Sequence, residues 1–349
     1  MAEFDFIKAA YGKPHQRVPI WIMRQAGRYL PQYRAVREKV SFLELCRSPE
    51  LMATVTKQPI DIFGFDAAIM FSDILLPLEP MGIKLAYENG GPTLSPAVQN
   101  PDDVKRLETY DPAEEMAHVL AGIREIKTRL DDVVPLIGFA GSPFTLACYL
   151  VEGGGSWQFY EIKRFIYKHP RAATHLLEHL AELTGRYLKE QINAGVNAVQ
   201  LFDSWGGILP PDAYREFSLP YIKTAFEICK IEGVPRILYL NNSAPYLKLL
   251  ADLDCEVVSV DWRTNLLEAA GILDGRALQG NLDPHLLFAP PETVYRQVIR
   301  ILEDMAGKDN FIFNLGHGIL PETPVDNVHL LVNTVHSFTW TENTTPLKK

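Results

Sequence analysis

Two arginines, Arg24 and Arg28, stand four residues apart in the segment WIMRQAGRYLPQYR (residues 21–34), directly after the apolar run PIWIM. Charged side chains are rarely placed beside buried segments without a partner. The planar guanidinium group matches a carboxylate or phosphate, so this spacing indicates an anion-binding segment. Residues 12–47 contain eight Lys or Arg against two Asp or Glu, a local balance of +6 in a chain of net charge −9. The pattern favours a small anionic ligand; a solvated basic surface is the alternative.

Polar residues follow the other apolar runs in the same way. The run at 65–71 leads into FSDILLP with Ser72 and Asp73, and the run at 197–202 leads into LFDSWGG with Asp203 and Ser204. Further examples are Tyr149 in the segment GFAGSPFTLACYLVEGGGS (138–156), Asn241 and Asn242, Asp261, Asn281, and His317 in NLGHG. Arginines combined with a carboxylate, a phenol, a hydroxyl and an imidazole suit a polyanionic substrate and acid–base or electrostatic catalysis.

Other chemistries lack their sequence patterns. No serine stands in a GxSxG elbow, and GGG at 153–155 is not followed by the Lys-Ser/Thr of a phosphate-binding loop. His175 and His179 lack the intervening glutamate of a HExxH zinc site, so we interpret them as part of a helix face. Without a dinucleotide or metal pattern, we expect no cofactor and no metal.

The elements that must position these residues are short apolar runs alternating with helical patterns. The predicted strands are 19–23, 65–71, 134–140, 197–202, 236–240, 256–260, 277–281 and 311–316. Helix-start signals lie between them, with Ser48 as an N-cap before Pro49 and Asp111 as the cap of a capping box with Glu114. This alternation predicts a (β/α)8 TIM barrel, in which site residues gather at the carboxyl ends of the strands. A doubly wound sheet is the alternative, but no GxGxxG follows the first run.

The chain is expected to form a single domain over residues 1–349, with a frayed tail at about 341–349 and a hairpin at 83–96 turning at Asn89-Gly90. The four scattered cysteines are typical of reduced thiols in a cytoplasmic protein. No apolar run is long enough to span a membrane, and the net charge of −9 argues against a nucleic-acid partner.

The strings RQAGRYLPQYR (24–34) and GFAGSPFTLACYLVEGGGS (138–156), with FSDILLP (71–77) between them, closely resemble the signatures and the aspartate loop of the uroporphyrinogen decarboxylase family. Similarity extends from PIWIMRQAGR to FNLGHGI, over nearly the whole chain. The first signature often has Glu where this chain has Gln32, a position beyond the two arginines.

The resemblance implies a distorted (β/α)8 barrel, a homodimer, and a carboxy-lyase of haem and porphyrin biosynthesis that needs no metal or cofactor. Its implied substrate is uroporphyrinogen III, whose four acetate side chains become methyls to give coproporphyrinogen III and carbon dioxide. By motif, Arg24 and Arg28 match the substrate-binding arginines, and Asp73 matches the aspartate that faces the pyrrole N–H groups. Tyr149, Ser204 and His317 match further substrate-binding residues of the cleft.

Several alternatives stay open at this stage. A zinc- or corrinoid-linked methyltransferase of the same superfamily is the nearest rival, although LYLNN (238–242) offers no His-x-Cys pair. A non-catalytic tetrapyrrole carrier is a second. Arg34 and Arg37 are expected to be surface charges. The group that supplies the proton, the order of the four decarboxylations, the isomer preference and the dimer interface are not predicted.

Overall fold

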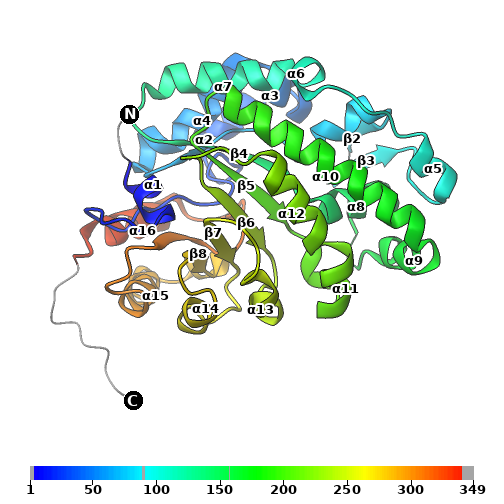
Figure 1. The fold of residues 1–349 in the computed structure, drawn as a ribbon. Helices are drawn as coiled ribbons and strands as arrows, with labels where there is room; N and C mark the ends of the chain where they lie inside the picture. The colour runs from blue at the N-terminus through cyan, green and yellow to red at the C-terminus, as the bar shows by residue number, and fades with distance from the viewer. Residues whose placement is uncertain (1–3, 89–90, 157, 340–349) are drawn as a thin grey trace.

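A curled parallel sheet forms the centre of the computed structural model, which describes residues 4–88, 91–156 and 158–339 (Figure 1). Seven strands of this described part pair in the order β1-β4-β5-β6-β7-β8-β9, all parallel. They are β1 (Ala68–Ile69), β4 (Leu136–Gly141), β5 (Ala198–Asp203), β6 (Arg236–Leu240), β7 (Val257–Val260), β8 (Ala277–Leu282) and β9 (Phe311–Leu315). Each overlaps a predicted strand, so the predicted parallel α/β order is confirmed at the level of these seven.

The predicted first strand, 19–23, is present only as a single bridge between Ile20 and Phe313. The amide of Phe313 donates to the carbonyl of Pro19 at 2.8 Å, and on the other side the amide of Asp66 donates to the carbonyl of Ile20 at 2.8 Å. A side-chain oxygen of Asp66 accepts the Ile20 amide at 2.9 Å. Residues 19–23 therefore lie between β9 and the residues before β1. The Asp66 carboxylate accepts the Ile20 amide where a backbone carbonyl of a neighbouring strand would accept it in a regular sheet.

Helices surround the outside of the curled sheet (Figure 1). The α-helices are α1 (Asp5–Ala10), α2 (Pro31–Arg37), α3 (Phe42–Arg47), α4 (Pro49–Phe63), α5 (Pro101–Lys105), α6 (Pro112–Glu115), α7 (Ala117–Leu130), α8 (Pro143–Glu152), α9 (Tyr160–Lys168), α10 (Pro170–Asn193), α11 (Pro211–Phe217), α12 (Leu219–Ile228), α13 (Leu247–Leu250), α14 (Leu266–Ile272), α15 (Pro291–Asp304) and α16 (Val325–Ser337). Short 3-10 helices are η1 (Leu76–Met81), η2 (Gly206–Ile208), η3 (Ala244–Tyr246) and η4 (Pro284–Phe288). Because helices cover the outer face, the strands are almost completely buried and mostly apolar.

The predicted start signals have mixed outcomes. Ser48 caps α4, accepting the amide of Leu51, as expected. Asp111 caps α6 through the amide of Ala113, but no reciprocal bond from Glu114 completes the predicted capping box. The predicted hairpin is formed by β2 (Lys84–Glu88) and β3 (Gly91–Ser95), an antiparallel pair; its turn at 89–90, like the tail at 341–349, lies outside the described residues.

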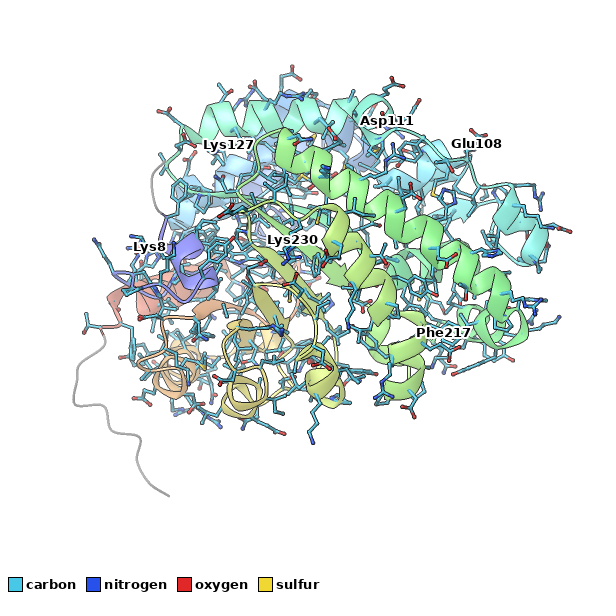
Figure 2. All side chains as sticks on the ribbon, viewed as in Figure 1. Lys8, Glu108, Asp111, Lys127, Phe217 and Lys230 are labelled. Atoms are coloured by element: carbon cyan, nitrogen blue, oxygen red, sulfur yellow. The ribbon has the colours of Figure 1, made fainter. Side chains whose placement is uncertain are left out.

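The amino edge of the sheet is a region of paired charges. Lys127, near the end of α7, and Lys230, after α12, are labelled in Figure 2. Lys127 donates to Asp132 at 2.7 Å, and Lys230 donates to Asp254 at 2.7 Å. The guanidinium of Arg236 is buried against Glu256, with a shortest contact of 2.9 Å. Each of these three cations therefore has a carboxylate partner within the protein.

Within the described residues, no helix is both long and apolar enough to cross a membrane.

Candidate active site

A cavity of about 710 Å³ opens at the carboxyl edge of the sheet. Its size falls within the range of roughly 300–1,000 Å³ typical of small-molecule sites. All the site residues predicted from the sequence line it: Arg24, Arg28, Asp73, Tyr149, Ser204 and His317. They come from the ends of different strands and the loops beyond, which is how parallel strands bring distant residues to one place.

Arg24 is held by two glycines and a strained backbone. Its φ of 64° lies in the left-handed region that residues other than glycine rarely adopt, a strain often found at functional sites. A Cβ on Gly27 would stand 2.7 Å from the Arg24 carbonyl oxygen. A Cβ on Gly318 would stand 2.4 Å from Arg24 Cδ. The glycines of RQAGR and NLGHG therefore leave room for this one side chain, which lies directly over the His317 loop.

His317 follows β9 as a neutral imidazole. Its Nδ1 accepts the backbone amide of Gly318 at 2.7 Å, so the ring proton resides on Nε2. Burial lowers the pKa of His317 to about 4, and the charge of Arg24 lowers it further in the same direction. The ring packs edge-on to Tyr239 and Trp262, with centroid distances of 6.2 and 6.3 Å. His317 is thus a fixed, uncharged N–H donor on the cavity wall.

Asp73 has both carboxylate oxygens engaged by the protein. Oδ1 accepts the amide of Leu75 at 2.7 Å, and Oδ2 accepts the hydroxyl of Tyr87 at 2.6 Å. Burial raises the pKa of Asp73, while these two hydrogen bonds and the charge of Arg24 oppose that rise. Among the described lining residues it is the one acid, and it shares the lining with Arg24, Arg28 and Arg37.

Tyr149 and Ser204 lie on neighbouring parts of the wall. Tyr149 projects from α8 and packs edge-on to Phe159 and Trp205, at centroid distances of 5.9 and 6.4 Å. Burial raises the pKa of Tyr149, so its phenol stays protonated and can donate. Ser204 directly follows β5, and its carbonyl accepts the side-chain amide of Asn241 at 3.5 Å.

Buried carboxylates at other strand ends build the loops and do not line the cavity. Asp203 is fully buried and accepts the hydroxyls of Ser142 at 2.6 Å and Ser218 at 3.0 Å, which ties β5 to α8 and α12. Asp261 accepts both the amide and the hydroxyl of Ser243. Asn241, Asn242, Asp261 and Asn281, expected at the mouth, are likewise outside the lining.

Arg34 and Arg37 behave differently from one another. Arg34 is exposed, as expected, and donates to the carbonyls of Arg28 at 2.7 Å and Tyr29 at 3.1 Å. Arg37 lines the cavity, so its prediction as a surface charge is wrong. It ends α2, donates to the carbonyl of Val40, and lies 5.8 Å from the ring centroid of Phe42. Arg28 lies before α2 and Arg37 is its last residue, so no helical periodicity relates the two along the sequence.

Apolar side chains fill the rest of the wall. They include Phe42, Ile69, Met70, Phe71, Ile74, Leu75, Phe139, Phe202 and Tyr239. The sequence did not point to Phe42 or Tyr87, which belong to separate segments, α3 and β2. A flat apolar ring system bearing several carboxylates would match this combination of an apolar wall, arginines and a single hydrogen-bond-accepting carboxylate.

A curled parallel sheet with a residue-lined cavity at its carboxyl edge is the arrangement of (β/α)-type enzymes, whose active sites lie at that edge. Residues 2–338 match the family model described as uroporphyrinogen decarboxylase. The uroporphyrinogen decarboxylase of Syntrophotalea carbinolica is 48% identical over 338 residues, covering 97% of this chain and 98% of the relative. That of Geobacter metallireducens is 46% identical over 332 residues, covering 95% and 97%. The chain belongs to the uroporphyrinogen decarboxylase family, which confirms the predicted carboxy-lyase of porphyrin biosynthesis.

Solved structures with a similar fold include methyltransferases. A methyltransferase from Methanosarcina mazei has a TM-score of 0.76 at 20% identity, covering 95% of this chain and 97% of its own. A putative vitamin-B12 independent methionine synthase from Listeria monocytogenes has a TM-score of 0.59 at 12% identity, covering 93% and 96%. At these identities the likeness concerns the fold alone. Among the described His, Cys, Asp and Glu side chains, no three gather in a group that could hold a metal ion.

Proposed function

We propose that the cavity binds uroporphyrinogen III and removes carbon dioxide from its four acetate side chains, giving coproporphyrinogen III. The observation that carries this proposal is that Asp73 lines the same apolar-walled cavity as Arg24, Arg28 and Arg37. A simple anion-binding site has no use for a carboxylate in its lining. A site that stabilises a cation formed on a polyanionic ring needs arginines for the carboxylates of the substrate and a carboxylate for the cation.

The reaction requires an electron sink, because loss of carbon dioxide leaves an electron pair on the former acetate carbon. Protonation of the adjacent pyrrole at its α-carbon provides the sink, since the ring then becomes an iminium-like cation. When the bond to the carboxylate breaks, its electron pair forms an exocyclic double bond and the ring is neutral again. A proton then adds to the exocyclic carbon to make the methyl group, and the α-carbon proton leaves.

Asp73 is suited to stabilise that cation. Each of its oxygens uses one lone pair on Leu75 or Tyr87 and retains another, so the carboxylate can accept N–H bonds from the pyrroles. Hydrogen bonds to an ionised acceptor are roughly twice as strong as neutral ones, and a partly desolvated site strengthens them further. Preorganised groups of this kind supply the largest share of many enzymes' rate enhancement.

Arg24, Arg28 and Arg37 bind the carboxylates in this proposal. An arginine is a poor acid but forms bidentate pairs with carboxylates, so positioning is the role its chemistry favours. Arg24 and Arg28 are both exposed, and only Arg24 is fixed by a left-handed backbone and by the close approach of Gly27 and Gly318. Arg24 is therefore suited to hold the reacting acetate, and Arg28 is suited to hold the other carboxylate side chains. Tyr149, Ser204 and neutral His317 donate hydrogen bonds to further carboxylate oxygens.

The complete architecture in this proposal is a distorted eight-stranded barrel in a single domain. The bonds of Pro19 and Ile20 to β9 and Asp66 support closure by the 19–23 segment. Family membership supports a homodimer, and the exposed rings of Tyr160 and Tyr167 on α9 offer apolar surface for a contact. The four buried, unpaired cysteines support a cytoplasmic location. Light scattering measures the dimer directly.

Anaerobic incubation with uroporphyrinogen III in the presence of a chelator tests the reaction. We expect release of carbon dioxide and a four-carboxylate porphyrinogen, separated by chromatography after oxidation to the porphyrin. Chelator-sensitive methyl transfer would select the methyltransferase alternative. Tight binding with unchanged uroporphyrinogen would select the carrier.

A further inference from the structure

Tyr87 is a hydrogen-bond partner of Asp73 that has no part in the proposed mechanism. It lies on β2 of the hairpin, and its hydroxyl donates to Asp73 Oδ2 at 2.6 Å. The amide of Leu75 holds the other oxygen at 2.7 Å. These two bonds fix the plane of the carboxylate and decide which lone pairs remain for a ligand.

We propose that Tyr87 is a positioning residue for Asp73, whose phenol holds the carboxylate ionised and turned toward the pyrrole N–H groups. This inference rests on the proposed role of Asp73. It makes Tyr87 a determinant of rate that acts through another residue and does not react itself.

An aromatic wall fixes the phenol. The Tyr87 ring packs against Phe42 with a centroid distance of 4.7 Å and an interplanar angle of 66°. Phe42 packs edge-on to Phe71 at 5.9 Å, and Phe71 contacts Tyr33 at 5.6 Å. All four rings line the cavity. A tyrosine has few rotatable bonds, so this packing sets the hydroxyl position before a substrate arrives.

The charges around Asp73 explain why a neutral donor is useful there. Groups that influence Asp73 or are influenced by it come from each packed element: Arg24, Cys46 of α3, Glu79 of η1, Tyr87 of β2, Tyr149 of α8 and Tyr187 of α10. Burial raises the pKa of Asp73, and the bond from Tyr87 is the strongest opposing influence. Burial and the neighbouring carboxylate raise the pKa of Tyr87, so its phenol keeps its proton and donates.

Tyr87→Phe removes the hydroxyl and keeps the ring in the aromatic wall. Loss of a hydrogen bond to the ionised carboxylate raises the pKa of Asp73, so the acidic limb of the kcat/KM profile moves to higher pH by about one unit. We expect kcat to fall about tenfold at pH values below the pKa of Asp73, where the carboxylate is mostly protonated, and to fall less at higher pH. KM stays near the wild-type value, because the arginines are untouched.

Tyr110→Phe is the matched control. The Tyr110 hydroxyl donates to the carbonyl of Pro77 at 2.6 Å, so the variant loses a phenol bond of the same length outside the cavity lining. Both variants are expected to lose similar thermal stability. Only Tyr87→Phe is expected to shift the acidic limb.

Asp73→Asn separates failure of this inference from failure of the proposed function. If Asp73→Asn is severely impaired but Tyr87→Phe keeps the wild-type limb, Tyr87 is not a positioning residue and the mechanism stands. If Asp73→Asn turns over normally, both proposals fall. In the Asp73→Asn background, we expect Tyr87→Phe to change kcat less than twofold; a further tenfold loss would show that Tyr87 acts independently of Asp73.

Discussion

Gly318→Ala is a one-carbon perturbation of the Arg24 position. The added Cβ would lie 2.4 Å from Arg24 Cδ and 2.8 Å from both Cγ and Nε. Non-bonded carbon atoms settle at about 3.5–4.0 Å, so either the arginine or the loop carrying His317 must shift by about 1 Å. The φ of Gly318 does not lie in the left-handed region, so alanine is compatible with the backbone itself.

A displacement of that size at a reacting centre can cost about 10²-fold in rate. We therefore expect kcat/KM for uroporphyrinogen to fall between about 10- and 100-fold. Anaerobic initial rates with product chromatography measure this loss, and thermal unfolding checks that the variant is folded.

Gly271→Ala is the control. Gly271 lies in α14, and a Cβ there would meet nothing within 4 Å. Gly271 is the second-last residue of this helix, so alanine there should stabilise by at most the roughly 0.5–1 kcal/mol expected in a helix interior, and activity should be unchanged. A folded Gly318→Ala protein with kcat/KM within twofold of wild type would refute the placement of Arg24 at the reacting acetate.

Two further predictions concern the cavity's other donors. Arg37→Ala should raise KM about tenfold, because a substrate carboxylate loses its partner. The control Arg215→Ala removes an exposed ion pair with Asp212 and should leave steady-state kinetics unchanged. Equal KM values for the two variants would show that Arg37 does not bind the substrate. Because the pKa of His317 is lowered to about 4, it stays neutral from pH 6 to 8 and adds no inflection near 6.5; an inflection in the wild-type kcat/KM profile that disappears in His317→Gln would contradict the neutral assignment.

The strand order was predictable from the sequence because it depends on local composition. Buried parallel strands are short apolar runs, and 236–240 was predicted with the bounds that β6 has. The segment 19–23 has the same composition but forms one bridge, because the Asp66 side chain takes the Ile20 amide that a neighbouring strand would otherwise accept. Propensity contains no information about that side-chain contact.

The part of the candidate site that follows the predicted strands could be predicted from the sequence, because site residues gather at the carboxyl ends of parallel strands. Arg24, Asp73 and His317 follow the 19–23 segment, β1 and β9, and their position after these apolar runs predicted that they lie on one edge. Tyr87 comes from a hairpin outside the sheet, and its contact with Asp73 depends on how β2 folds back over the cavity. Arg37 reaches the cavity from the end of α2, where a charged residue ordinarily faces solvent. Both contacts are tertiary, so spacing along the chain did not reveal them.

The most direct test of the central claim compares turnover and binding in Asp73→Asn. The claim is that one ionised carboxylate among arginines stabilises the pyrrole cation. With uroporphyrinogen III under anaerobic conditions, the variant should form product on the order of 10²-fold more slowly or worse, as expected for loss of a preorganised electrostatic group. Its substrate Kd should stay within about tenfold of wild type, because the arginines remain. Turnover near the wild-type rate would contradict the account.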